Sequence, residues 1–194
     1  MILPIVTLGN KILRKKCEPV TKHDEQLSRF INDMWETLHN SNGVGLAAPQ
    51  ANSNLQLFIV NSTLAYNELD AVDQSKLFPD DTGINETFIN ARIIEKSKDT
   101  WRDEEGCLSI PGIYEQVNRA WQITVEYRNL NFEQQVRTFS GYTARVIQHE
   151  YDHTQGKLFI DHISPLRKKI LRSRLMKIIN GKVKTSYAML VTNK

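Results

Sequence analysis

The chain has 194 residues, of which 40% are hydrophobic and 24% are charged, and its formal net charge is +3. This length predicts a single domain over residues 1–194, and the composition is that of a globular protein rather than a disordered chain or a repeat array. So small a net charge gives no argument for nucleic acid by itself.

The N-terminal stretch MILPIVTLGNKILRKK does not have the layout of a signal peptide, because its apolar run is short and its basic residues follow that run. No apolar run approaches the roughly 20 residues that a membrane span needs. The chain has only two cysteines, Cys17 and Cys107, which favours a reducing compartment. We therefore expect a cytoplasmic protein without a membrane partner.

Apolar periodicity predicts an amphipathic helix over residues 25–38, with Leu27, Ile31, Met34 and Leu38 among the residues on one face. Residues 55–60 and 87–96 read as strands, and the polar stretch 61–86 between them reads as a surface excursion. Residues 120–141 predict two strands joined by a turn at Asn129–Asn131. A helix over 142–156 follows, closed by Gly156.

The stretch 164–180 predicts a C-terminal helix, with Ser164 as its cap and Pro165 in its first turn. The tail after it alternates in a way that favours an edge strand. Strands and helices follow one another without a βαβ rhythm. We therefore expect an α+β fold with antiparallel sheets.

The stretch QHEYDH contains the chain's clearest chemical motif. On a helix, His149 and His153 point the same way, so their rings can reach one metal ion, and Glu150 can lean over a water bound there. The alternative is a chance match on a solvated helix face. Val146 and Ile147 precede the motif and indicate a buried helix, in which these polar side chains need partners.

A catalytic zinc-type site usually has a third protein ligand. The extended protease pattern is excluded because position 159 is Phe, and His162 reads as an ordinary loop or strand-end residue. Cys107 is the better candidate, in a loop-like stretch beside Gly106, although a free cysteine is more often a small buried core residue. The stretch SNGVGLAAPQ, residues 41–50, lets another element or a ligand approach the backbone, or is merely a helix cap with a tight turn.

Together, GVGLAAPQ, EGCLS and QHEYDH resemble the three signature segments of the peptide deformylase family, in the family's order. The resemblance spans residues 43 to 153. It implies removal of the formyl group from the N-terminal methionine of nascent proteins. It also implies a fold in which antiparallel sheets surround the helix that carries HExxH, with an N-terminal amphipathic helix and a basic C-terminal helix.

The resemblance also implies the site. It assigns one divalent metal ion, with Fe(II) as the native ion and Zn, Ni or Co as alternatives, to Cys107, His149 and His153. Glu150 would be the general base, and Gln50 with the N–H of Leu108 would hold the carbonyl oxygen. The residues that would bind the substrate are Gly43, Val44, Gly45, Glu105, Gly106, Tyr142, Arg145 and Val146. Two positions depart from many family members: Arg145 replaces an apolar residue, and Tyr114 stands where some members have arginine.

The C-terminal helix has a basic face made of Arg167, Lys168, Lys169, Arg172, Arg174 and Lys177. Such a face is usually just solvated, but in this family it can dock on the ribosome near the nascent-chain exit. We expect a monomer that binds N-formylmethionyl nascent peptides and no DNA. Two alternatives remain at this stage, a zincin-type metallopeptidase and a non-catalytic metal- or RNA-binding module on the ribosome.

Overall fold

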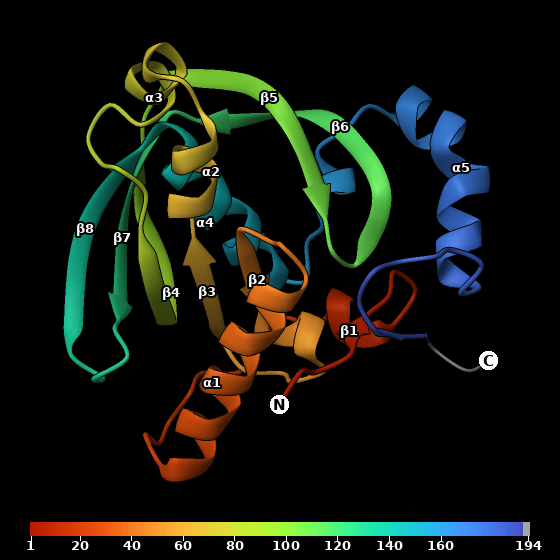
Figure 1. Ribbon diagram of the computed structural model, residues 1–194, viewed down its shortest axis with the longest axis horizontal. Helices are drawn as coiled ribbons and strands as arrows, with labels where there is room; N and C mark the ends of the chain where they lie inside the picture. Colours follow the sequence, from red (N-terminus) through yellow and green to blue (C-terminus); the bar gives the residue numbers. More distant parts are fainter. Residues whose placement is uncertain (192–194) are drawn as a thin grey trace.

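The computed structural model describes residues 1–191. Its main sheet is antiparallel, and its strands in spatial order are β2 (Gly45–Ala47), β3 (Leu57–Asn61), β4 (Asn85–Lys96), β7 (Gln122–Arg128) and β8 (Gln134–Ser140). A separate antiparallel hairpin joins β5 (Thr100–Cys107) to β6 (Ile110–Ala120). Figure 1 shows this hairpin reaching from the sheet towards the C-terminal helix.

The helices differ in length and position. The longer ones are α1 (Glu25–Asn40), α4 (Gly141–Thr154) and α5 (Pro165–Ile179), and the short ones are α2 (Thr63–Glu68) and α3 (Ala71–Leu77). Single turns of 3-10 helix form at η1 (Lys11–Arg14), η2 (Ala48–Ala51) and η3 (Phe159–Asp161). Within residues 1–191, none of the helices combines the length and the apolar composition that crossing a bilayer requires.

Strand β3 shows how the sheet separates two cores. Its side chains alternate, as those of a strand must: Phe58 and Val60 face the cluster that contains α4, whereas Leu57 and Ile59 face the cluster that contains α1. All are fully buried. A third cluster fills the space between the β5–β6 hairpin, η3 and α5. Helix α4 therefore lies against the sheet with protein on nearly every side.

Helix α1 begins and ends where the sequence provides caps. The Asp24 side chain accepts a hydrogen bond of 2.9 Å from the N–H of Leu27, which satisfies one of the free donors of the first turn. The helix ends at Asn40, and Asn42 adopts a left-handed conformation with φ of 52°. The chain then turns directly into β2, which brings the segment GVGLAAPQ over the sheet edge.

The structure confirms antiparallel sheets and corrects one expectation. The surface excursion 61–86 contains α2 and α3, each too short to show a helical period. The prediction that Cys107 lies in a loop is wrong, since Cys107 is the last residue of β5. Half of the residues of β5 are charged and one face of it is exposed, so the stretch lacks the apolar signal of a strand.

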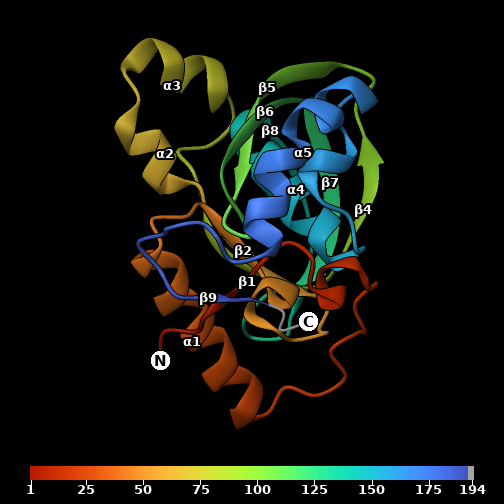
Figure 2. The same cartoon turned by 90° about the vertical axis from the view of Figure 1, so that its right-hand side faces the viewer.

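The tail forms β9 (Met189–Leu190), and its partner is distant in the sequence. Strand β9 pairs in parallel with β1 (Ile5–Val6), with Ile5 opposite Met189. Figure 2 shows the two strands side by side, below the hairpin and α5. This is the one parallel pairing among the strands of residues 1–191, and it holds the segment before β9 against the rest of the molecule.

Gly141 joins β8 to α4 at a crowded point. Its φ is +57°, and a Cβ built there would lie 2.1 Å from the carbonyl oxygen of Leu77 at the end of α3. We expect Gly141→Ala to lower the free energy of unfolding by roughly 3 kcal/mol or more, because left-handed strain and a backbone clash add together. Urea denaturation measures the loss.

Gly112→Ala is the matched control for that substitution. Gly112 also has a positive φ, +70°, but nothing lies within 4 Å of its added Cβ. This variant should lose only the left-handed term, about 1 kcal/mol. Equal losses in both variants would show that the contact with Leu77 has no energetic role.

Candidate active site

Helix α4 carries the HEYDH residues in a buried position. His149, Glu150 and His153 are 8%, 4% and 1% exposed. The four-residue spacing places the two imidazole rings on one side of the helix, with centroids 5.1 Å apart. Polar side chains buried this deeply require hydrogen-bonding, ionic or metal partners. The groups around these three side chains therefore indicate the chemistry of the site.

Cys107 arrives at these rings from the end of β5. Its Sγ lies 3.3 Å from Nε2 of His153, and one donor atom from each of Cys107, His149 and His153 lies within 4.8 Å of the others. A thiolate sulfur and an imidazole nitrogen that share a tetrahedral ion are about 3.6 Å apart, from bond lengths of about 2.3 and 2.1 Å. The sulfur and the two rings therefore fit a metal ion.

Glu105 orients the first of these rings. Its Oε2 lies 3.0 Å from Nδ1 of His149, so Nε2 of that ring is directed towards Cys107 and His153. Burial alone would raise the pKa of Glu105, but hydrogen bonds from Arg119 and His149 outweigh burial and hold that pKa well below its usual range. An ionised carboxylate behind a histidine is the usual support for a metal-binding ring.

The surroundings shift the pKa values of the two histidines in opposite directions. Burial opposes a charge on His149, but Cys107 and Glu105 together raise its pKa well above the ordinary value. Burial and the neighbouring His149 lower the pKa of His153 well below that value. A metal ion would take the place of the proton that this donor set favours on His149.

Gln50 presents its amide N–H groups to the site. Its side chain is 1% exposed, and its Oε1 accepts a 2.8 Å hydrogen bond from the N–H of Ala47. This bond fixes the amide orientation, so Nε2 faces Cys107 Sγ at 3.5 Å and Ser109 Oγ at 3.3 Å. Leu108 follows Cys107 at the hairpin tip and lines a cavity that Gln50 and Cys107 also line.

Glu150 has a carboxylate that the fold presses against β2. A Cβ built on Gly45 would lie 2.5 Å from Oε1 of Glu150, so only glycine leaves room for this carboxylate. Among residues 1–191, no side chain or backbone group hydrogen-bonds its buried Oε2. Burial raises the pKa of Glu150 to about 7, although the charge of His149 opposes the shift. A carboxylate with that pKa can exchange a proton near neutral pH.

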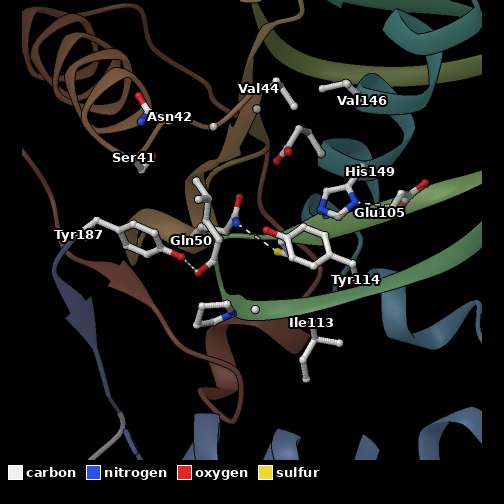
Figure 3. Close-up of a pocket in the computed structure, with 18 of the residues that line it drawn as sticks. Ser41, Asn42, Val44, Gln50, Glu105, Ile113, Tyr114, Val146, His149 and Tyr187 are labelled. Atoms are coloured by element: carbon white, nitrogen blue, oxygen red, sulfur yellow. Dashed lines mark hydrogen bonds and ion pairs between the residues drawn. The ribbon is translucent and has the colours of Figure 1, made fainter. Parts of the chain in front are cut away.

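All eight residues predicted to bind the substrate line one cavity of about 520 Å³, which also contains Cys107, His149 and Glu150. Figure 3 shows Val44 and Val146 on one side of it, Tyr114 beside His149, and Gln50 across from them. The ring of Tyr114 lies against Gly106, where an added Cβ would be 2.5 Å from it.

Arg145 binds Glu105, a contact that the sequence did not predict. Its guanidinium donates to Glu105 Oε1 at 2.6 Å and to the carbonyls of Val117 and Trp101, although the residue also lines the cavity. The side chain is 2% exposed and stacks on the Trp101 ring at 4.2 Å. It therefore neutralises Glu105, and a role for Arg145 in substrate binding stays a prediction.

Arg119 and Asp152 extend this network and were not identified from the sequence. Arg119 donates twice to Glu105, at 2.9 Å, and once to Asp152 at 2.5 Å. His162 contacts Asp152 at 2.7 Å, so it supports the network and takes no place beside the three candidate ligands. Arg119 lies next to the C-terminal end of β6, on the buried face of a strand whose side chains alternate between buried and exposed. A cation at such a buried position was the signal available in the sequence.

Comparison with known proteins gives a consistent result. The family model described as polypeptide deformylase matches residues 2–169. The peptide deformylase of Christiangramia forsetii is 42% identical over 195 residues, covering 100% of this chain and 97% of the relative. The crystal structure of peptide deformylase from Ehrlichia chaffeensis superposes with a TM-score of 0.82 at 29% identity, covering 94% of this chain and 99% of that one. A peptide deformylase structure from Legionella pneumophila gives 0.77 at 35% identity, covering 94% and 98%.

The contact between Glu105 and His149 predicts a loss of metal affinity when it is weakened. Glu105→Gln removes the charge that orients the ring and strengthens it as a ligand, so affinity for Zn²⁺ should fall by about 10- to 100-fold. Competition with a chelating dye measures the affinity. Glu104→Gln is the matched control, because Glu104 is the exposed neighbour on the same strand. Equal affinities for the two variants would contradict the role of Glu105.

Proposed function

The chain belongs to the peptide deformylase family, and from this membership we propose how its residues carry out the family's reaction. The protein is a metal-dependent hydrolase that removes the N-formyl group from the initiator methionine of nascent proteins and releases formate. The observation that supports the proposal is the convergence of Cys107, His149 and His153 within 4.8 Å of one another.

Cys107, His149 and His153 are the proposed metal ligands. A divalent ion held by them would supply Lewis-acid chemistry, polarising the formyl carbonyl and making a water more acidic. The family resemblance favours Fe(II) as the native ion, and a soft thiolate with two imidazoles also suits Zn, Ni or Co.

Glu150 is the proposed general base and acid. It takes a proton from the water that attacks the formyl carbon, and it then passes that proton to the departing amine. The close packing of Gly45 against this carboxylate keeps it buried, and burial raises the pKa of Glu150 towards neutrality. A pKa near neutrality suits both the uptake and the release of the proton. Gln50 Nε2 and the N–H of Leu108 are the proposed donors to the carbonyl oxygen as negative charge develops on it.

Strand β2 is the proposed docking edge for the peptide backbone. It is an edge strand of the main sheet, and the carbonyl of Val44 bonds to Asn61 of β3 at 2.8 Å. Successive residues of a strand direct their backbone groups to opposite edges, so the N–H and C=O of Gly45 face the open side. An extended peptide can pair there while Val44, Tyr142 and Val146 surround its methionine side chain.

The two alternative functions are not favoured. A zincin-type peptidase has no use for Cys107, and His162, a downstream histidine, binds Asp152 instead of joining the ligands. A non-catalytic module would not need a buried, unpaired carboxylate oxygen beside three metal-binding groups. We further propose that the protein acts as a monomer in the cytoplasm, where nascent peptides are made.

Glu150→Gln separates catalysis from metal binding. The variant should retain its metal, since Glu150 is not a ligand, and lose about 100- to 10,000-fold in kcat because a proton acceptor is missing. Formate release from formyl-Met-Ala-Ser by anaerobically prepared protein measures turnover, with the metal counted on the same sample.

In the unmodified protein, kcat/KM should fall on the acid side as Glu150 becomes protonated, and the charge of the ion places this limb at or below pH 7.

Cys107→Ser provides the contrast to that variant. It should lose the metal itself, because a neutral hydroxyl is a poor substitute for a thiolate. A Cys107→Ser protein with full metal content would contradict the ligand assignment. Normal turnover by Glu150→Gln would contradict the assignment of the base.

Ribosome docking of α5 is a further part of the proposal. Half of its basic face has internal partners, since Arg167 binds Glu115, Arg174 binds the Gly112 carbonyl, and Lys168 contacts the Asp161 carbonyl. Lys169, Arg172 and Lys177 are exposed, whereas the buried residues of the helix are Leu171 and Ile178. These three cations are the ones available for ribosomal RNA.

Replacing Lys169, Arg172 and Lys177 with alanine should abolish co-sedimentation with ribosomes at low salt, because fewer counterions are released. The control replaces three exposed lysines of another segment, Lys15, Lys16 and Lys22, and has the same net charge. Equal co-sedimentation of the two variants would show that net charge, and not α5, governs the association.

A further inference from the structure

A segment from the C-terminal tail forms part of the active-site cavity. Lys184, Thr185, Ser186 and Tyr187 line the same cavity as Cys107, His149 and Glu150. Figure 3 shows Tyr187 on the opposite side of this cavity from His149. The family model matches only residues 2–169, so this wall is built from residues outside that match.

The segment is held to the rest of the molecule just after Tyr187, and a hydrogen bond within the segment fixes the backbone just before it. Strand β9 follows it and pairs with β1, where the N–H of Ile5 donates to the Ala188 carbonyl at 2.9 Å and that of Thr7 donates to the Leu190 carbonyl at 3.0 Å. Before it, the Thr185 hydroxyl donates to the Tyr187 carbonyl at 2.7 Å. The Tyr187 side chain therefore projects from a backbone that is held to the body of the molecule.

The hydroxyl of Tyr187 donates a 2.9 Å hydrogen bond to the carbonyl of Leu108. The ring is partly buried against the same apolar cluster as the Leu108 side chain. Burial raises the pKa of Tyr187 to about 12, so the phenol keeps its proton and remains a donor throughout the neutral range. The contact joins residues 79 positions apart in the sequence.

Leu108 lies at the tip of the β5–β6 hairpin, where a few hydrogen bonds hold the backbone. Only Leu108 and Ser109 separate β5 from β6. Ser109 is held by the N–H of Leu8, which donates to its carbonyl at 2.9 Å, and by Gln50, which donates to its hydroxyl at 3.3 Å. The Leu108 N–H lies in the peptide plane it shares with the Cys107 carbonyl, and the Leu108 carbonyl lies in the next plane; φ and ψ of Leu108 connect the two. Cys107 is held in β5, so fixing the Leu108 carbonyl restricts these two angles and, with them, the direction of the N–H.

We propose that Tyr187 is a positioning residue for deformylation, which holds the Leu108 carbonyl so that the Leu108 N–H is aimed at the substrate's carbonyl oxygen. The inference rests on the proposed role of Leu108. A preorganised donor is effective because it needs no reorientation when charge develops. The aromatic ring has a separate effect, since it closes one side of the groove in which the peptide lies.

Tyr187→Phe and Tyr187→Ala separate the two effects. The Phe variant keeps the ring and loses the hydroxyl, so kcat for formyl-Met-Ala-Ser should fall by roughly 5- to 30-fold while KM stays within about twofold; complete loss of such a donor costs about 100- to 1,000-fold. The Ala variant should show the same loss in kcat and a KM raised by about fivefold or more, because the wall is also removed. Metal content should be unchanged in both.

Tyr127→Phe is the matched control. It removes one phenol oxygen from a 2% exposed ring in β7, outside the cavity, and among residues 1–191 that oxygen has no hydrogen-bond partner. Its kcat and KM should stay within twofold of the unmodified protein.

Two results would overturn the proposal. One is a Tyr187→Phe protein with kcat within twofold of the unmodified protein. The other is a fall in kcat that matches a fall in metal content, which would make the contact merely structural. Failure of the proposed function looks different, because then the unmodified metal-loaded protein would release no formate, or Glu150→Gln would turn over normally.

Discussion

The carboxylate of Glu105 accepts hydrogen bonds from Arg119, Arg145 and His149, and these contacts join β5, β6 and α4 at the centre of the molecule. Taking charges out of water costs several kcal/mol for each ion, so such a group is stable only when its partners are complete. Here two guanidinium groups face Glu105, and Asp152 faces one of them from the other side. Each partner lies on an element that also carries or orients a group of the active site.

The same close packing connects stability with chemistry at Gly45. Helix α4 approaches β2 so closely that the Glu150 carboxylate occupies the space where a side chain at position 45 would lie. The approach buries the carboxylate, which raises its pKa to about 7. It also leaves an uncovered strand edge directly beside that carboxylate. One steric condition therefore places the proposed general base beside the strand edge on which we propose that the peptide extends.

The sequence predicts those parts of the fold whose apolar spacing is regular. Leu27, Ile31, Met34 and Leu38 mark α1, and all four are buried against the sheet. The β5–β6 hairpin escaped notice, because residues such as Arg102, Asp103 and Glu104 give its first strand no apolar alternation. The short helices α2 and α3 also lack enough turns to display a period.

The candidate site shows the same division. His149, Glu150 and His153 are recognisable because one helix brings them together, and Cys107 and Gln50 because they belong to short characteristic segments. The task of Arg145 was not predictable, since it depends on Glu105 and Trp101, which lie about 40 residues away. Tyr187 meets Leu108 only through the fold of the tail, and no local pattern marks such a contact.

The parallel pairing of β1 with β9 has a consequence for the order of assembly. A ribosome makes β1 first and β9 last, and segments made early begin to fold before those made late. Every group proposed to hold the ion or to move the proton precedes residue 155, whereas Lys184, Thr185, Ser186 and Tyr187, which form one wall of the cavity, follow residue 180. During synthesis, the residues of the proposed reactive centre are therefore made before residues 184–187. The cavity wall and the pairing of β1 with β9 form only after the tail has been made.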